Sequence, residues 1–132
     1  MNYKDLRGHP ADFEVEYRFL TSEEGGRLSG PPRQHYRSDW SYAGDDIQKE
    51  GIFMIHPEFL SDAGELATED EPVAWKGRAT MWILIPEMRK EVHQKRIKEG
   101  VRGFFMEGNK VVAEALVTRI IGLHTNPTNP HT

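Results

Sequence analysis

The sequence predicts an all-β fold, either a barrel or a sandwich of antiparallel strands. Three features indicate it: alternating apolar and polar residues near the N-terminus, a hairpin signal near the C-terminus, and six or seven short strand-like segments separated by turns. Long helical patterns are missing between these segments. Because closing a sheet removes its unpaired edges, a barrel suits a chain rich in aromatic and β-branched residues.

The first part of the chain carries two strand patterns. Alternation over 13–20 (FEVEYRFL) places charged residues on one face and four apolar residues on the other: Phe13, Val15, Tyr17 and Phe19. The segment 23–27 (EEGGR) has the backbone freedom of two glycines and predicts a turn or bulge. After a Gly-Pro-Pro loop at 30–32, aromatic residues recur at even spacing over 35–42, which predicts a second strand.

The middle of the chain is denser in apolar residues. The runs 52–55 and 79–85 (ATMWILI) predict strands that are covered on both faces. The segment 86–100 has a proline near a helix start and a glycine past a helix end, but its apolar residues fit a helical period only partly. The sequence therefore predicts a helix and an extended segment equally well for 86–100.

The C-terminal part predicts a hairpin. Two strand patterns, 101–106 and 111–121, lie on either side of Glu107-Gly108-Asn109-Lys110. A Gly-Asn pair between two such strands predicts the hairpin turn. From the alternation in all the strands we expect these core residues: Val15, Tyr17, Phe19, Ile83, Ile85, Val101, Phe105, Val112, Leu116 and Ile120.

Size and charge restrict the class of protein. A length of 132 residues fits one domain, and the net charge of −4 argues against indiscriminate nucleic-acid binding. The charge is unevenly spread: 58–72 holds six acidic and no basic residues, whereas 87–102 holds six basic and three acidic residues. A solvated rim and a docking surface explain this polarity equally well. Because neither a signal peptide nor a membrane helix is visible, we expect a cytoplasmic protein that does not enter a membrane.

The residue types do not form a recognisable reactive site. A phosphate-binding G-x-x-x-x-G-K-[ST] loop is missing, so GTP binding is not expected. The chain has no cysteine, its six histidines lack metal-ligand spacing, and none of its serines lies in a nucleophile elbow. We therefore expect a protein that is not an enzyme, with no cofactor and no metal. An enzyme stays open only if the segment 43–75 builds a pocket around a perturbed carboxylate.

Two blocks of sequence carry a family resemblance. The first, 16–27, reads EYRFLTSEEGGR. The second, 92–121, reads VHQKRIKEGVRGFFMEGNKVVAEALVTRII and contains these matching residues: His93, Glu99-Gly100-Val101-Arg102, Glu107-Gly108, Lys110 and Val117-Thr118-Arg119-Ile120. Together they resemble the opening strand and the last two strands of the third domain of bacterial elongation factor Tu. The resemblance covers 13–121.

The resemblance implies a six-stranded antiparallel Greek-key barrel. It divides the chain into an N-terminal extension (1–12), the barrel (13–122) with an insertion around 43–75, and a flexible tail (123–132). In that family the domain binds no nucleotide, packs against a GTPase domain, contacts an exchange factor and touches the T-stem backbone of aminoacyl-tRNA. The sequence holds no counterpart of the family's GTPase domain.

The resemblance also implies binding residues. The family's tRNA-contacting turn, E-G-G, matches Glu107 and Gly108, and Gln34 corresponds to a family glutamine in a Pro-Gln-aromatic stretch. Two departures, Asn109 for the second turn glycine and Gln94 for a proline, lie on the expected barrel rim. Because partners are chosen at the rim, these departures weaken the inference of inherited binding.

Two functions follow from these observations. The first is a stand-alone, non-catalytic module that docks on a protein partner, with the translation machinery as the first place to look. The alternative is an accessory RNA-binding domain that contacts the backbone of tRNA or rRNA through these residues: Arg89, Lys95, Arg96, Arg102, Glu107, Gly108 and Lys110. Phosphate contacts weaken steeply with salt, which distinguishes the two.

Overall fold

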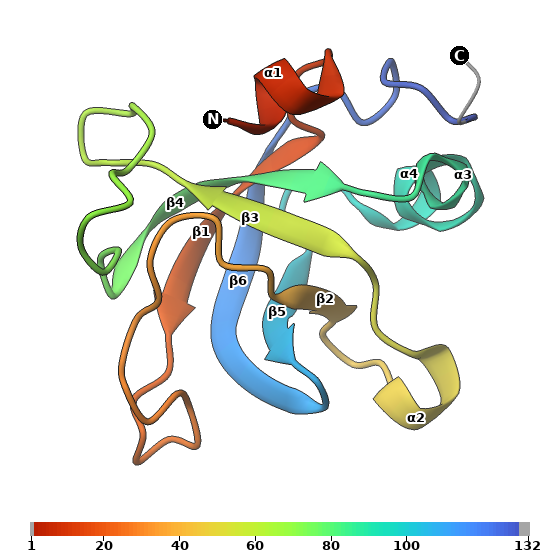
Figure 1. Ribbon diagram of the computed structural model, residues 1–132. Helices are drawn as coiled ribbons and strands as arrows, with labels where there is room; N and C mark the ends of the chain where they lie inside the picture. The colour runs from red at the N-terminus through yellow and green to blue at the C-terminus, as the bar shows by residue number, and fades with distance from the viewer. Residues whose placement is uncertain (1, 130–132) are drawn as a thin grey trace.

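The computed structural model describes residues 2–129 and consists mainly of sheet (Figure 1). Six antiparallel strands curl into a half-barrel in the order β2-β5-β6-β1-β4-β3. Their bounds are β1 Phe13–Phe19, β2 Asp39–Tyr42, β3 Ile55–Phe59, β4 Lys76–Ile83, β5 Arg102–Glu107 and β6 Lys110–Ile120. The prediction of an all-β fold built from antiparallel strands is confirmed.

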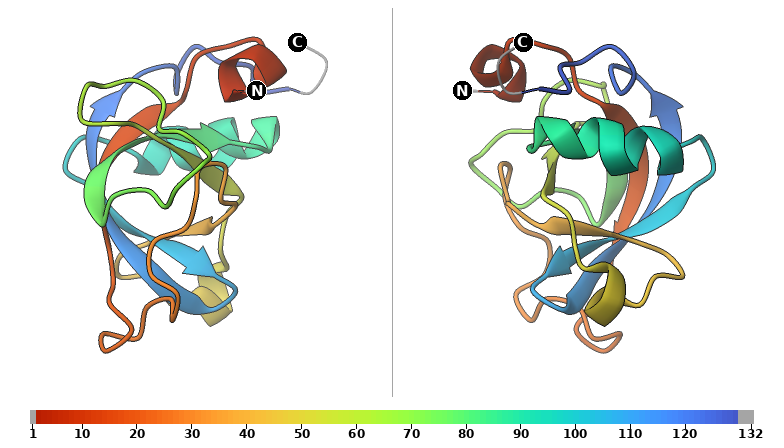
Figure 2. Two further views of the ribbon diagram at one scale, coloured as in Figure 1. Left: turned by 60° about the vertical axis from the view of Figure 1, so that its left-hand side comes forward. Right: turned by 90° about the vertical axis from the view of Figure 1, so that its right-hand side faces the viewer.

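Short helices lie between the strands and before them. Their bounds are α1 Tyr3–Arg7, α2 Ile47–Glu50, α3 Pro86–Met88, η1 Arg89–His93 and α4 Gln94–Arg96. The last three are continuous, so the segment that the sequence left open is helical from Pro86 to Arg96. Figure 2 (right) shows this helix lying across the strands, at the same end of the sheet as α1. Within residues 2–129, no helix has the length and apolar character needed to cross a membrane.

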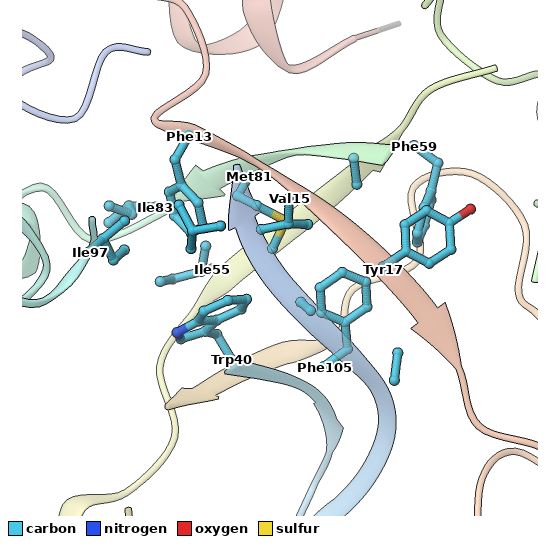
Figure 3. Packing of buried hydrophobic residues seen from close by; sticks show 14 of the residues in the cluster. Phe13, Val15, Tyr17, Trp40, Ile55, Phe59, Met81, Ile83, Ile97 and Phe105 are labelled. Carbon is cyan, nitrogen blue, oxygen red and sulfur yellow. The ribbon is translucent and has the colours of Figure 1, made fainter. Parts of the chain in front are cut away.

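The core lies on the concave face of the sheet (Figure 3). All four apolar residues of the β1 alternation are buried, as predicted. Among the other expected core residues, Ile83, Phe105 and Val112 are also buried. Ile85 was expected in the core but is 40% exposed, because β4 ends at Ile83 and the chain turns outward before α3. Val101 and Ile120 are only partly buried and pack against the edge of the core.

The register of β6 differs from the expected alternation. The inward side chains are Ala113, Ala115 and Val117, whereas Leu116 is only partly buried. The β5–β6 pairing shifts by one residue near Val112, where the ladder passes from Ala113 directly to Val111. One extra residue in a strand reverses the face of every residue beyond it. The prediction that Leu116 lies in the core is therefore wrong.

This register predicts a contrast between two neighbouring substitutions. Val117→Ala should lower the free energy of unfolding by about 1.5–3 kcal/mol, because it removes fully buried apolar surface. Leu116→Ala should lower it by about 1 kcal/mol or less, because much of that side chain already contacts water. Urea denaturation of both variants measures the contrast. A larger loss in Leu116→Ala than in Val117→Ala would contradict the register.

The two ends of the chain pack together on the sheet. The tail was expected to be flexible from residue 123, but Leu123 is fully buried and Asn126 donates its side-chain amide to Pro10 O and Asp12 Oδ1, both at 2.9 Å. The start of the tail is thus part of the fold, and residues 130–132 lie outside the described residues. The expected insertion, 43–75, contains α2, β3 and the acidic loop that follows β3.

Candidate functional site

The predicted hairpin is present between β5 and β6. Glu107 and Lys110 form the last pair of the ladder, and Gly108-Asn109 makes the turn. Gly108 has a φ of +58°, whereas among the described residues other than glycine only His35 has a positive φ. A glycine with positive φ at the first central position is typical of a type II′ hairpin turn. Asn109 does not have a positive φ, so the second central position of the turn does not require a glycine.

The two segments that carry the family resemblance meet at this hairpin. Arg27 Nε donates to Glu107 Oε1 at 2.8 Å, and the hydroxyl of Tyr36 donates to the same oxygen. The Arg27 guanidinium also lies over the Tyr36 ring, 5.0 Å from its centroid. Burial and the bond to Glu107 raise the pKa of Tyr36, so the phenol stays protonated. Glu107 thus ties two loops to the hairpin.

The loop 20–30 beside the hairpin is held by its own hydrogen bonds. The Glu24 carboxylate accepts from both nitrogens of the Arg18 guanidinium fork, at 2.9 and 3.1 Å, and from Thr21 N at 2.9 Å. The bond to Arg18 lowers the pKa of Glu24 to about 2. A side chain at Gly26 would collide with the backbone of Leu20, 2.3 Å from its carbonyl oxygen. These constraints fix the loop against the end of β1.

Two large apolar side chains are exposed on this end of the sheet. Leu28 is 90% exposed and Trp75 is 47% exposed. The Trp75 ring lies against Gly30, where a Cβ would be 3.5 Å from Cζ2. Loop 20–30 and the turn at 108–109 both lie at the lower end of the molecule in Figure 1. We call loop 20–30, Trp75 and the turn at 108–109 the hairpin end.

Gln34, an expected partner contact, is instead a structural residue. It is buried, and its Nε2 donates to Phe59 O at 2.8 Å and to Ala67 O at 3.1 Å. Its Oε1 accepts from Phe59 N at 2.8 Å. The side-chain amide therefore pairs with the free edge of β3 as a further strand would. Both of its polar atoms are used inside the protein.

Two of the basic residues expected to contact RNA are instead paired with carboxylates of this protein. Arg89 is 1% exposed and pairs with Asp12, with Nε 2.7 Å from Oδ1. The prediction that Arg89 contacts an RNA phosphate is therefore wrong, because its guanidinium does not reach the surface. Arg96 makes two 2.8 Å bonds to the Asp45 carboxylate and lies 3.9 Å from the centroid of the Tyr42 ring. The same bonds lower the pKa of Asp45.

The remaining expected cations do not gather on one surface. Lys95, Arg102 and Lys110 are exposed, and their side chains make no ion pair or hydrogen bond within residues 2–129. Arg102 and Lys110 lie at opposite ends of the β5–β6 hairpin, which at ~3.3 Å per residue separates them by roughly 17 Å. Only Glu107, Gly108 and Lys110 are brought together. The sequence pattern did not point to Tyr36, which meets Glu107 from a loop far away in the chain, or to Leu28, whose exposure depends on how its loop packs.

A second polar cluster joins the loop before β2 to β3. His35 has a φ of +70°, and its ring lies between two carboxylates. Nε2 lies 3.2 Å from Glu58 Oε2, and Nδ1 lies 2.6 Å from Glu69 Oε1. Both ring nitrogens therefore contact carboxylate oxygens of this protein. Across residues 2–129, no group of three or more His, Cys, Asp or Glu residues has the geometry to hold a metal ion.

Comparison with known proteins adds no family. No protein-family model matches the sequence, and no curated protein matches it well enough to identify a relative.

Proposed function

We propose that this chain is a non-catalytic binding module that docks on a protein partner through the hairpin end. The observation that carries the proposal is the exposure of Leu28 on a loop that is fixed by local hydrogen bonds. Trp, Tyr and Arg are enriched in the small centres that dominate binding energy at protein interfaces, and exposed apolar groups beside them add area for docking. Because the loop is already ordered, binding costs little conformational entropy.

The fold supports a barrel of the Greek-key type within this proposal. β1 lies between β6 and β4, and such non-sequential neighbours arise from Greek-key connections. Trp40 and Phe53 exchange two backbone hydrogen bonds, of 2.9 and 2.8 Å, between β2 and the residues before β3. This contact narrows the open side of the half-barrel. A relationship to the third domain of elongation factor Tu is part of the proposal, and it makes a cytoplasmic component of translation the first partner to test.

The alternative, binding to tRNA or rRNA backbone, has less support. Arg89 is buried, Arg96 is paired with Asp45, and the unpaired cations are spread over opposite ends of the hairpin. Proteins that bind a nucleic-acid backbone usually present their cations along one surface. If tRNA binds at about 50 mM salt with an affinity that falls steeply as salt rises, the RNA function replaces the proposed one.

Affinity capture with matched variants tests the docking surface. The purified chain is immobilised and exposed to nuclease-treated extract of its native cells, beside the variants Leu28→Asp and Trp75→Ala. We expect the retained protein to fall by about tenfold or more in Leu28→Asp, as for a residue at an interface centre. Ile85→Asp is the control, because Ile85 is exposed but lies beyond β4, away from the hairpin end. Equal retention by Leu28→Asp and the unchanged chain would contradict the proposal.

A further inference from the structure

A pocket of about 460 Å³ lies between α1 and the outer face of the sheet, away from the hairpin end. Residues from α1, the loop before β2, the start of β3 and the end of β4 line it. Small-molecule sites in proteins typically have volumes of about 300–1,000 Å³. The pocket is therefore large enough for a small organic ligand.

Hydrogen-bond donors with few or no partners in the protein line the pocket. The Tyr3 hydroxyl, the His56 ring and the Arg37 guanidinium make no hydrogen bond within the described chain, and Arg7 makes one long bond of 3.4 Å to Leu84 O. His56 is only 7% exposed. Arg7 and Arg37 are exposed, and the four side chains line one pocket, which suits a ligand that accepts hydrogen bonds.

The charges around the pocket favour an anion. Arg7 and Arg37 both line it, and no carboxylate does. Two acidic residues lie close by: Glu58, which already accepts from Tyr3 N and faces His35, and Asp39, which acts on His56 from β2. Burial lowers the pKa of His56, an effect that Arg37 and Arg7 reinforce, so the ring is neutral at neutral pH. A neutral imidazole donates one hydrogen bond, and the two guanidinium groups supply the charge.

Three apolar side chains also line the pocket. Leu6 is 61% exposed, Met54 is 48% exposed, and Leu84 is partly buried. We infer that the pocket binds a small organic anion, with a carboxylate or phosphate group held by Arg7 and Arg37 and an apolar part packed on Leu6 and Met54.

The pocket wall contributed by α1 is already in place. The Tyr3 ring packs on Trp82, with centroids 5.5 Å apart, and meets the edge of His35 at 5.7 Å. Tyr3 N donates to Glu58 Oε2 at 3.1 Å, and Asn2 caps the helix through a 2.8 Å bond from Asp5 N. Little reorganisation is therefore needed when a ligand enters.

Titration calorimetry on the full chain tests this site with defined probes. The probes are phenyl phosphate and phenylacetate as organic anions, benzyl alcohol as their neutral analogue, and inorganic phosphate. We expect one of the two organic anions, or both, to bind at a single site, more tightly than benzyl alcohol and inorganic phosphate. Arg37→Gln should weaken binding by about tenfold or more, because charge-assisted hydrogen bonds are lost. The double variant Arg7→Gln/Arg37→Gln should show no binding.

Two controls separate this site from general charge effects and from the proposed function. Arg33→Gln removes an exposed, unpaired arginine from the same loop and should leave binding unchanged. Leu28→Asp should also bind the probes normally, because the hairpin end is distant from the pocket. Absence of binding by both organic anions, equal binding of benzyl alcohol or inorganic phosphate, or unchanged affinity in the double variant would each overturn the inference.

Discussion

Replacing Asp12 by Ala should lower the free energy of unfolding by about 3–5 kcal/mol, because it leaves the Arg89 guanidinium buried without its counter-ion. The Asp12 carboxylate accepts from Ile83 N at 2.8 Å, Arg89 Nε at 2.7 Å and Asn126 Nδ2 at 2.9 Å. Arg89 also donates to Ile83 O at 3.1 Å and to Pro127 O. The pair therefore joins the N-terminal extension, the end of β4, the helix and the C-terminal segment.

Urea denaturation at neutral pH measures this effect. The double variant Asp12→Ala/Arg89→Met should recover most of the loss, since replacing both partners of a buried pair by apolar groups is often neutral. Glu87→Ala is a control, because Glu87 is exposed on the same helix and makes no ion pair in the described part of the chain. A loss below about 1 kcal/mol in Asp12→Ala would show that the buried pair contributes little to stability.

Acidification from about pH 7 to pH 5 should cost about 2 kcal/mol of stability through His93 alone. His93 is 1% exposed, and its Nδ1 lies 2.7 Å from the Tyr42 hydroxyl. Burial lowers its pKa to about 4, with smaller contributions from Arg96 and Arg89. In the unfolded chain the pKa returns to about 6.5. Between these two pH values the unfolded state binds the proton and the native state does not. The contribution of His93 to the free energy of unfolding is therefore complete above about pH 6.5 and is lost as the pH falls toward the native pKa.

The variant His93→Asn isolates this effect. Asn keeps an acceptor near the Nδ1 position for Tyr42 but does not titrate. His56, whose pKa is also lowered by burial, titrates in the same range and is present in both proteins. The difference in pH dependence between the two therefore belongs to His93. If both proteins lose stability equally between about pH 7 and pH 5, the imidazole is not a buried neutral group.

The sequence patterns predicted the parts of the fold that depend on neighbouring residues in the chain. The alternation in β1 placed Phe13, Val15, Tyr17 and Phe19 correctly, because a half-buried strand repeats every two residues. The Gly-Asn turn between β5 and β6 was also predicted, because few residues accept its backbone angles. The sequence did not decide whether 86–96 is helical, because the apolar spacing is irregular there and a π-helical turn, η1, lies in the middle of the helix.

The errors came from features that depend on tertiary contacts. The one-residue shift in β6 reversed the face of Leu116, and no local signal marks where a bulge will lie. Arg89 and Gln34 resemble surface residues in the sequence, yet Asp12 and the backbone of Phe59 hold them inside. The exposed Leu28 could not be recognised either, because its exposure depends on how loop 20–30 packs against the end of the sheet.

Photo-crosslinking shows whether a protein partner docks at the hairpin end. A photo-reactive amino acid replaces Leu28 in one sample and Ile85 in another, and each is irradiated in nuclease-treated extract of the native cells. We expect a discrete protein adduct from position 28 and none from position 85. No adduct from position 28, or the same adduct from both positions, would contradict docking through the hairpin end.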